Sequence, residues 1–378
     1  MKIPILKIPY SKKSISNIKK GLTDIIKNGN FTMSENVQKF EKKFSSIIRT
    51  RYSIAVNSGT SALEIIFRSI NVENKYVIVP TNTFMATPLA VLHAGGKVIF
   101  CDIDKNDLCL SYNSLKNKIK NKNIAAVVIV HIGGIISANL DNILKLCRKK
   151  KIPLVEDCAH AHGSKYKNKF AGNLGIAGAF SFYPTKIINS AEGGIITTNS
   201  KRIFKLANIL REHGKQKKQI NFHTELGYNW RFSELHALLG LEQIKRFDKI
   251  INERIKLAKY YDKYLQDTNK YIKIKIPKNT VCAYYKYIIL LKKNVKNKIK
   301  KLMLKKYKIH LPGEVYDFMC HKQPVFKKYK KKILNYKEKL PIAESIEKKQ
   351  LCLPLYLGLN NKKLNYIIKS IKKVTEIV

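Results

Sequence analysis

The sequence predicts an α/β fold in which a large domain, built on a mostly parallel seven-stranded sheet flanked by helices, is followed by a smaller C-terminal α+β domain. Two patterns indicate this. Between Tyr52 and Thr198, short apolar runs alternate with longer amphipathic stretches, as in parallel sheets that helices cover on both faces. After about residue 265 this alternation gives way to isolated strand-like runs and one closing helix. The length of 378 residues is enough for two domains.

Seven apolar runs have the length and flanking residues of buried strands. Helical patterns separate most of them, but only a short loop that contains Lys186 joins the last two. We therefore expect mainly parallel pairing, with antiparallel pairing between the last two strands. The predicted strands are Tyr52–Val56, Tyr76–Pro80, Lys97–Cys101, Ala125–Val130, Ile152–Glu156, Ala179–Phe182 and Gly194–Thr198.

A long amphipathic run from Ser233 to about Leu265 leads into the C-terminal part and has the length of a connecting helix or helix pair. The strand and helix candidates beyond it are Tyr271–Ile276, Tyr284–Leu291 and Asn360–Val378. The predicted division is a large domain of residues 1–245, which includes an N-terminal arm, and a small domain of residues 246–378.

Lys186 is the strongest candidate for a reactive side chain. It follows the apolar strand Ala179–Phe182 and stands shortly before Gly193 and Gly194. Packed apolar surroundings lower the pKa of a lysine, so that more of it is the free amine that attacks a carbonyl. Pyridoxal phosphate uses such an amine, together with an acid on its pyridine nitrogen. Because most lysines in this chain are expected to be solvated, the upstream segments decide whether Lys186 is different.

The first of these segments runs from Asn57 to Leu63 and predicts an anion site. Gly59 allows a tight turn, Thr60 and Ser61 supply hydroxyls, and a helical pattern begins directly after the strand Tyr52–Val56. Free N–H groups in the first turn of a helix attract phosphate. An ordinary N-cap is the alternative, and a nucleotide P-loop is excluded because the Gly-Lys-Ser/Thr ending is missing.

The second segment ends a predicted strand with an acid. Asp157 follows Ile152–Glu156, and ligands of open α/β sheets gather at such strand ends. A carboxylate there can keep a pyridine nitrogen protonated, although a purely structural aspartate is the alternative. His160 and His162 also suggest metal ligands, but no compact set of further ligands completes a site, and we expect none.

The third segment contains Phe84, which can stack on a flat heterocycle or belong to the core. The order of an anion site, an aromatic residue, an acid and then Ser181-x-x-x-x-Lys186 is that of a fold-type I pyridoxal phosphate enzyme. At these motifs the chain resembles the DegT/DnrJ/EryC1/StrS family, the aminotransferases of nucleotide-linked keto sugars. The motifs that carry the resemblance, which covers most of the chain, are Gly29–Thr32, Val37–Glu41, Ser58–Leu63, Glu156–Gly163, Phe180–Lys186, Gly227–Glu234 and Leu353–Tyr356.

The resemblance implies a role for each matching residue. Lys186 would bind pyridoxal 5'-phosphate covalently and then carry the proton, and Asp157 would pair with the pyridine nitrogen. Phe84 would stack on the ring, and His160 would lie beside it. The remaining cofactor contacts implied are Gly59, Thr60, Ser61 and Ser181 at the phosphate and Asn229 from the neighbouring subunit of a homodimer. Two departures from the family pattern leave these roles intact: Ala191-Glu192-Gly193-Gly194 stands where many members show Gly-Asp-Gly-Gly, and Cys158 replaces a common Ala.

The resemblance also implies a reaction. An amino acid, usually glutamate in this family, would supply the amino group, and a nucleotide-linked 4-keto-6-deoxyhexose would accept it, with a 3-keto sugar as the alternative. A related dehydrase activity is disfavoured because that group has histidine where this chain has Lys186. The segments expected to shape the sugar pocket include His310–Tyr316, and the candidate substrate residues are Asn30, Tyr183, Glu192, His310 and Tyr316. The nucleotide, whether UDP, GDP or dTDP, stays open.

The net charge of +47 suggests binding to nucleic acid or to an anionic membrane. However, only nine of the 73 basic residues are arginines, and base readout and tight phosphate binding favour arginine. The lysines are spread along the chain, and no recognisable nucleic-acid-binding motif accompanies them. We therefore expect no nucleic-acid partner.

The sequence further favours a cytoplasmic protein without a membrane span. Pro4 and Lys7 interrupt the N-terminal apolar residues, and no apolar run approaches the roughly 20 residues of a transmembrane helix. Seven scattered cysteines fit a reducing compartment and offer no iron–sulfur motif. A non-catalytic regulatory protein on the same scaffold is a further alternative, which the intact Lys186, Asp157 and Asn229 disfavour.

Overall fold

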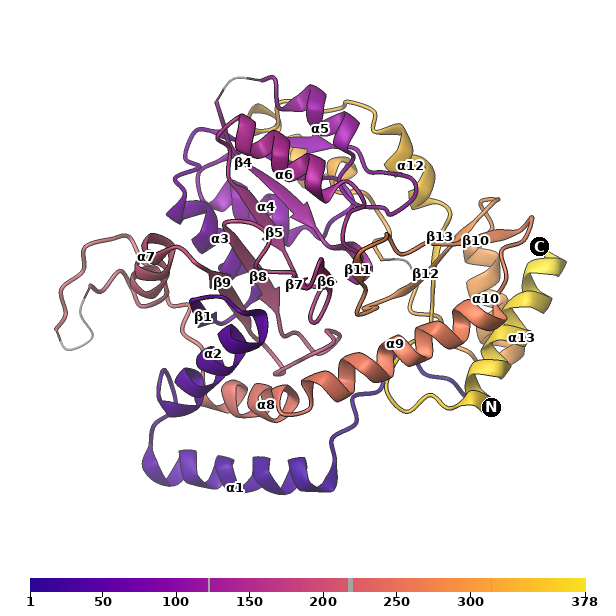
Figure 1. The fold of residues 1–378 in the computed structure, drawn as a ribbon, viewed down its shortest axis with the longest axis horizontal. Coiled ribbons are helices and arrows are strands. Elements are labelled where there is room, and N and C mark those ends of the chain that lie inside the picture. The colour runs from indigo at the N-terminus through magenta and orange to yellow at the C-terminus, as the bar shows by residue number, and fades with distance from the viewer. Residues whose placement is uncertain (122, 217–219, 314) are drawn as a thin grey trace.

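A computed structural model describes residues 1–121, 123–216, 220–313 and 315–378. A seven-stranded sheet forms the centre of the larger part of the molecule, and helices cover both of its faces (Figure 1). Its strands are β1 (Tyr52–Val56), β2 (Tyr76–Pro80), β3 (Lys97–Cys101), β4 (Ile124–Val130), β5 (Leu154–Asp157), β8 (Ala177–Ser181) and β9 (Gly194–Thr198). All seven predicted strands are present, with bounds that differ by at most two residues at either end.

The strand order in this sheet is β1-β9-β8-β5-β4-β2-β3. β9 is antiparallel to both of its neighbours, and the pairs from β8 to β3 are parallel. The α/β fold class and the antiparallel pairing of the last two strands are therefore confirmed. Parallel pairing brings the carboxyl ends of β5 and β8 to the same edge of the sheet, where ligands collect in such folds.

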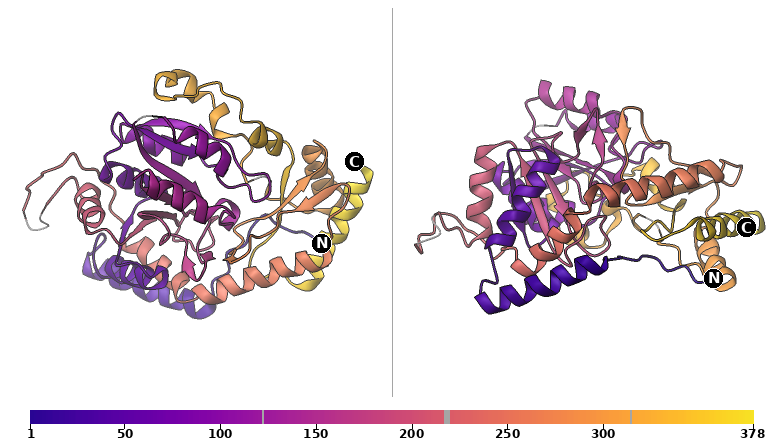
Figure 2. Two further views of the ribbon diagram at one scale, coloured as in Figure 1. Left: turned by 45° about the horizontal axis from the view of Figure 1, so that its top comes forward. Right: turned by 60° about the horizontal axis from the view of Figure 1, so that its bottom comes forward.

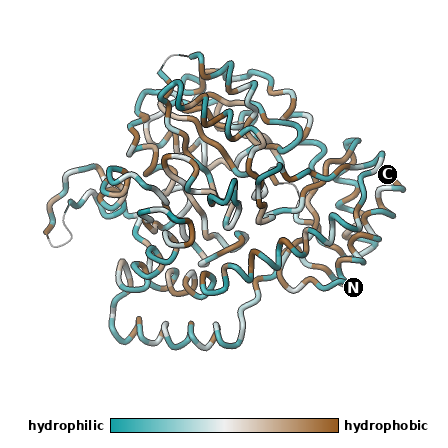
Figure 3. Tube along the Cα trace, in the orientation of Figure 1, coloured by the Kyte–Doolittle hydropathy of each residue, from teal (hydrophilic) through white to brown (hydrophobic). Residues whose placement is uncertain are grey.

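Side chains alternate between the two faces of the sheet, because successive residues of a strand point in opposite directions. In β1, Ile54 and Val56 join one buried apolar cluster, whereas Ala55 joins the other. Figure 3 shows the hydrophobic colouring concentrated along these strands and more hydrophilic residues on the outer helices. The first cluster contains residues of α3 (Gly59–Ser69), α4 (Ala86–His93), α7 (Lys201–Arg211) and α12 (Pro341–Glu347), and the second those of α2 (Glu35–Ile48), α5 (Tyr112–Lys118), α6 (Leu140–Lys149) and α8 (Glu234–Ile244).

The predicted connecting run is a pair of helices, α8 and α9 (Phe247–Tyr264), which break at Lys245 and Arg246. α9 leads to a second sheet with strand order β10-β12-β13, made of β10 (Tyr271–Lys273), β12 (Tyr287–Leu291) and β13 (Gln350–Leu353). The remaining helices of this region are α10 (Lys296–Tyr307), α11 (Val325–Lys328) and α13 (Asn361–Ile377). The predicted small α+β part is present, while the domain boundary at residues 245 and 246 stays a prediction.

The two predicted C-terminal strands are shorter in the structure. β10 ends at Lys273, where the sequence predicts a strand to Ile276, and β12 begins only at Tyr287. Tyr284 has a positive φ of 52°, which ends an extended strand at that point. The sequence patterns also missed β13 and a small sheet of two-residue strands, β6 (Lys165–Tyr166), β7 (Lys169–Phe170) and β11 (Thr280–Val281).

The N-terminal residues cross from α1 (Lys12–Asn28) to the C-terminal part of the chain (Figures 1 and 2). The buried Ile3 donates its N–H to the carbonyl of Lys308, at 3.1 Å, and its carbonyl accepts from the N–H of His310, at 2.9 Å. No helix in the described part of the chain combines the length and the hydrophobicity that crossing a membrane requires.

Residues 333–335, in the C-terminal part of the chain, cover the open edge of the large sheet at β3. The side-chain amide of Asn335 donates to the carbonyl of Phe100, and its amide oxygen accepts from the Phe100 N–H, at 2.8 and 2.9 Å. Leu334 also donates to the carbonyl of Val98, at 3.0 Å. A side chain thus replaces a neighbouring strand, which protects the edge from pairing with other chains.

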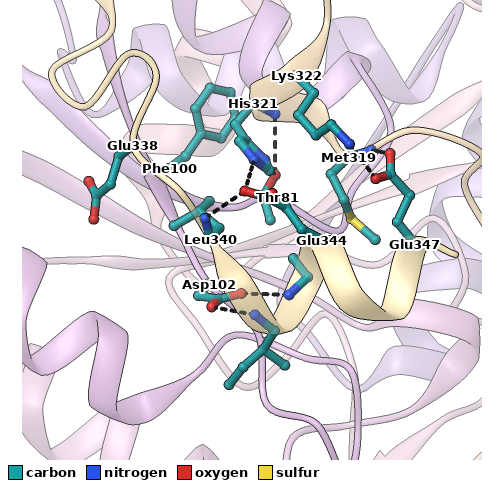
Figure 4. Close-up of polar contacts among 12 residues, drawn as sticks. Thr81, Phe100, Asp102, Met319, His321, Lys322, Glu338, Leu340, Glu344 and Glu347 are labelled. Atoms are coloured by element: carbon teal, nitrogen blue, oxygen red, sulfur yellow. Dashed lines mark hydrogen bonds and ion pairs between the residues drawn. The ribbon is translucent and has the colours of Figure 1, made fainter. Parts of the chain in front are cut away.

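The residues on either side of this segment, from 319 to 347, are fixed to the ends of β2 and β3 by polar contacts between buried or partly buried groups (Figure 4). His321 contacts Thr81 Oγ1 at 2.6 Å and Glu344 at 3.3 Å, and Asp102 accepts from two backbone N–H groups at the start of α12. Cys320 donates its N–H to the carbonyl of Thr81, at 3.0 Å. These contacts hold the residues before Cys320, including Tyr316, beside Phe84.

Candidate active site

A cavity of about 400 Å³ lies at the carboxyl ends of β5 and β8, next to the start of α3. Parts of the chain that are far apart in sequence meet there. The residues that line it are Ser58, Gly59, Thr60, Leu63, Phe84, Ala86, Asp157, Ala159, His160, Ala179, Ser181, Tyr183, Thr185, Lys186, Glu192, Gly193, Tyr285, Val315 and Tyr316. The cavity therefore contains most of the site residues that the sequence predicts.

The N-terminus of α3 forms one wall of this cavity. Ser58 caps the helix by accepting from the N–H of Ser61, at 3.1 Å. The N–H groups of Gly59 and Thr60 have no hydrogen-bond partner among the described residues. A Cβ atom on Gly59 would lie 2.9 Å from Cβ of Ser181, so glycine allows the helix to begin directly against β8. This wall can bind an anionic group such as a phosphate.

Asp157 ends β5 at the cavity and is almost fully buried. Its Oδ2 accepts from Thr87 Oγ1, at 2.8 Å, and its Oδ1 accepts from the N–H of Ala159, at 3.1 Å. Thr87 in turn shares a 2.6 Å hydrogen bond with Thr83. These contacts fix the orientation of a carboxylate that faces the cavity.

Lys186 lies in the turn that follows β8, and its backbone N–H donates to the carbonyl of Tyr183, at 2.9 Å. Its Nζ lies 5.0 Å from the centre of the Tyr285 ring. Burial lowers the pKa of Lys186 to about 8, while the charge of Asp157 acts in the opposite direction. A larger fraction of Lys186 is therefore a nucleophilic amine at neutral pH than for a solvated lysine.

His160 is stacked between two tyrosines. Its ring centre is 4.0 Å from that of Tyr285 and 5.9 Å from that of Tyr316. Burial and the nearby Lys186 charge hold the pKa of His160 well below its usual value. Because Nδ1 accepts from the N–H of Gly133, at 3.3 Å, the neutral ring carries its proton on Nε2, which faces the Tyr316 hydroxyl at 3.4 Å.

Phe84 lies at the mouth of the cavity with 60% of its surface exposed, and it stacks against Tyr316 at 6.0 Å. An aromatic side chain that is this exposed beside a buried acid and a buried amine can cover a flat ring. The anion site, the acid, the amine and the aromatic cover together fit pyridoxal 5'-phosphate. Thr60 lines the cavity at the start of α3, and Ser181 and Asp157 line it at the ends of β8 and β5.

Of the predicted substrate residues, Tyr183, Glu192 and Tyr316 line the cavity, whereas Asn30 and His310 do not. Asn30 is exposed in the turn after α1, and His310 pairs with the N-terminal residues. Their assignment as substrate residues stays a prediction. Glu314, within the predicted segment His310–Tyr316, lies outside the described residues.

Two predicted cofactor residues also stand apart from the cavity lining. Ser61 is buried and donates its hydroxyl to Asn57 Oδ1, at 2.6 Å, so it supports the start of α3. Asn229 is exposed and pairs with Glu212 at the base of an arm formed by residues 213–216 and 220–228, and its carbonyl accepts from the side chain of Asn57, at 3.5 Å. Asn229 contributes nothing to the cavity of its own chain.

The sequence missed Tyr285, Thr185 and Thr87 as site residues. The hydroxyls of Tyr285 and Thr185 are hydrogen-bonded at 3.1 Å, and Thr185 directly precedes Lys186 in sequence. Tyr285 comes from the C-terminal part of the chain and looks like one residue of an apolar strand, so no sequence signal separated it from the core. Thr87 lies three residues after Phe84, and its hydroxyl was the only available signal.

His131, Glu156 and Cys158 are buried and bring their ligand atoms within 4.8 Å of one another. Glu156 is already saturated, because its oxygens accept from the N–H groups of Gly172, Leu174 and Gly175 at 2.7–2.8 Å and contact His131 at 2.9 Å. This carboxylate fixes the loop before β8. It offers no free oxygen to a metal ion.

His162 is buried among the rings of Phe44, Phe180 and Phe182, and neither of its ring nitrogens has a hydrogen-bond partner among the described residues. Burial lowers its pKa to about 3, from an unfolded value of 6.5. Between these two values the unfolded chain binds more protons than the folded chain, so the stability contribution of neutral His162 is present above pH 6.5 and is lost as the pH falls.

We expect acidification from about pH 7.5 to about pH 5 to lower the free energy of unfolding by about 2 kcal/mol through His162 alone. A His162→Leu variant keeps the apolar volume and lacks this proton, so it should lose about 2 kcal/mol less over the same interval. Urea denaturation of both proteins at the two pH values, at one protein concentration, measures the difference. Equal losses in the two proteins would contradict the prediction.

The sequence model of the DegT/DnrJ/EryC1/StrS aminotransferase family matches residues 12–372. The chain is 32% identical over 378 residues to the UDP-4-amino-4,6-dideoxy-N-acetyl-beta-L-altrosamine transaminase of Campylobacter jejuni, with 98% of each chain covered. It is 29% identical over 344 residues to the GDP-perosamine synthase of Escherichia coli O157:H7, with 89% of each covered. Its fold matches that of DesV from S. venezuelae with a TM-score of 0.91, at 22% identity over 100% of this chain and 99% of that one.

Proposed function

The chain belongs to the DegT/DnrJ/EryC1/StrS aminotransferase family, and on this basis we propose that it transfers an amino group from L-glutamate to a nucleotide-linked keto sugar. It is a pyridoxal-phosphate-dependent aminotransferase, in agreement with the sequence-based expectation. The observation that carries the proposal is the placement of Lys186, with its lowered pKa, in one cavity with Asp157 and the start of α3. This is the set of groups that aminotransfer requires.

Each residue of the site has a distinct task in this proposal. Bound pyridoxal phosphate supplies an electron sink and a carrier for the amino group. Asp157 would hold the proton of the ring nitrogen, since its charge is fixed by Thr87 and the Ala159 N–H. Gly59, Thr60 and Ser181 would hold the phosphate, and Phe84 would cover the ring.

Lys186 is the base and acid of both half-reactions. Its Nζ takes the proton from the α-carbon of the donor amino acid, and it gives a proton to the former carbonyl carbon of the sugar. A pKa of about 8 leaves both protonation states accessible near neutral pH, which suits a group that must accept and then donate. Both substrates use the same site in turn, and ping-pong kinetics follow.

The sugar assignment is supported by the names of two relatives. Both the UDP-linked altrosamine transaminase and the GDP-perosamine synthase carry a nucleotide-linked amino sugar in their names. We propose a 4-keto-6-deoxyhexose as the acceptor, with Tyr183, Glu192 and Tyr316 as the sugar-contacting residues of the cavity. The net charge of +47 would favour the approach of a diphosphate-linked substrate.

We further propose a homodimer with a shared site in the cytoplasm. The arm that carries Asn229 projects away from the body of the chain (Figure 1) and exposes the apolar Ile220, Phe222 and Leu226. A second subunit would cover these side chains, and Asn229 would then reach the phosphate of that subunit. The cytoplasmic location is supported by the seven cysteines, all of which are buried and none of which forms a disulfide within the described residues.

The proposed reaction predicts a two-stage response. Protein incubated with pyridoxal phosphate should gain a visible absorption band, L-glutamate should bleach it with release of 2-oxoglutarate, and the acceptor should restore it. UDP-, GDP- and dTDP-linked 4-keto-6-deoxyhexoses are supplied as acceptors, and mass spectrometry identifies the amino sugar. Turnover only with 3-keto sugars would replace the acceptor assignment. A folded protein without the band would contradict the enzymatic assignment and favour a regulatory role.

A further inference from the structure

A turn at residues 283–286 brings a second lysine, Lys286, next to Tyr285, a residue that lines the active-site cavity. The Nζ atoms of Lys186 and Lys286 lie 5.0 and 5.3 Å from the centre of the same Tyr285 ring. The two nitrogens are therefore no farther apart than the sum of these distances, 10.3 Å. Two ammonium groups at that separation in a largely buried environment repel each other appreciably.

The turn is held firmly in this position. Tyr284 has a positive φ of 52°, which is unfavourable for a tyrosine and requires support from its surroundings. The guanidinium of Arg254 supplies that support by donating to the carbonyl oxygens of Tyr284 and Tyr285, at 2.6–3.1 Å. Lys286 also donates its N–H to the carbonyl of Gly133, at 3.3 Å. The fold thus fixes the backbone from which the second lysine extends.

Lys286 is partly buried and forms no ion pair with a carboxylate of the described residues. The ionisable groups that influence the two lysines are Asp157, His160, Arg254 and Cys352. Only Asp157 is a carboxylate, and it acts on Lys186. The positive charge of Lys286 is therefore not neutralised locally and acts on the cavity.

We propose that Lys286 is a positioning residue whose ammonium group keeps a larger fraction of Lys186 in the free-amine form. The proposal rests on the proposed role of Lys186 in aminotransfer and adds a charge that sets its reactivity. Burial is the largest cause of the lowered pKa of Lys186, Asp157 opposes it, and Lys286 adds to the lowering. A cation beside a reactive lysine is a general means of activating the amine.

Site-resolved labelling of the protein without cofactor tests this proposal. Trace acetic anhydride acetylates each lysine in proportion to its free-amine fraction, and mass spectrometry of peptides reports the rate at Lys186 as a function of pH. Lys286→Met should raise the midpoint of this titration and slow Lys186 labelling about threefold at about pH 7. Lys286→Arg, which keeps the charge, should retain the wild-type midpoint. The exposed Lys278→Met is the control for loss of one positive charge.

A midpoint that is unchanged in Lys286→Met would overturn the proposal. So would slower labelling with an unchanged midpoint, because that result indicates altered access and not altered charge. If circular dichroism shows that Lys286→Met is misfolded, Lys286→Gln takes its place, and added salt in the wild-type protein should also raise the midpoint. The labelling needs no turnover, so its outcome is separate from that of the absorption and acceptor assays of the proposed function.

Discussion

Replacement of Lys186 with alanine should lower kcat by about 10⁴-fold or more, because one substitution removes both the covalent attachment of the cofactor and the group that moves the proton. The cavity offers no direct substitute. His160 is neutral and stacked between two tyrosines, and Tyr285 and Tyr316 have raised pKa values through burial. Stopped-flow measurement of amino transfer from glutamate gives the rate, and borohydride reduction followed by peptide mass spectrometry locates the cofactor on Lys186 in the wild type.

The exposed Lys145→Ala on α6 provides the matched control and should behave as the wild type. Small primary amines should restore part of the activity of Lys186→Ala, since they can enter the space left by the side chain and carry the proton. Rescue should increase with the basicity of the amine. A variant that turns over at more than about one tenth of the wild-type rate would contradict the assignment of Lys186 as proton carrier.

The part of the cavity that is formed at strand ends was largely predictable from the sequence. Gly59, Asp157 and Lys186 each follow directly on a predicted strand of one parallel or mixed sheet, and the ends of neighbouring strands meet in space. The positions of these residues after predicted strands therefore indicate that they lie close together at one edge of the sheet. Two of the strands that bring Asp157 and Lys186 together, β5 and β8, are direct neighbours.

The part that comes from distant segments was not predictable in the same way. Tyr285 reaches the cavity because Arg254 and the turn at Gly133 hold its backbone, and these contacts connect residues with no regular spacing. Tyr316 depends on the hydrogen bonds of Cys320 and His321 to Thr81. Asn30 and His310 do not line the cavity of the same chain, and their predicted contact with the substrate stays a prediction.

The backbone at Ala191 illustrates how a departure from a family pattern acts locally. Ala191 stands where the resemblance leads us to expect glycine, and its φ is +67°. This left-handed conformation costs an alanine about 1 kcal/mol relative to glycine. The sequence identified the departure, but its physical consequence appears only in the backbone angle. Ala191 lies in the loop before β9, next to the cavity residues Glu192 and Gly193.

Asp157→Asn should lower kcat by about 10²- to 10³-fold and change KM for the sugar nucleotide much less. The asparagine oxygen can still accept from the N–H of Ala159, and its amide nitrogen can donate to Thr87, because the hydrogen bond between Thr83 and Thr87 can run in either direction. The side chain thus keeps its place while its negative charge is lost. Steady-state kinetics with glutamate and the preferred acceptor provide the measurement.

Thr87→Val separates the charge of Asp157 from its orientation. Valine fills the same buried volume and leaves Oδ2 without its 2.8 Å donor, while the carboxylate keeps its charge and its contact with Ala159. We expect a loss of only about tenfold. If Asp157→Asn retains more than about one third of the wild-type kcat, the charge is not used in the reaction. If Thr87→Val loses as much kcat as Asp157→Asn, the orientation of the carboxylate matters more than its charge. The two variants separate these effects because only Asp157→Asn removes the carboxylate that would keep the ring nitrogen protonated.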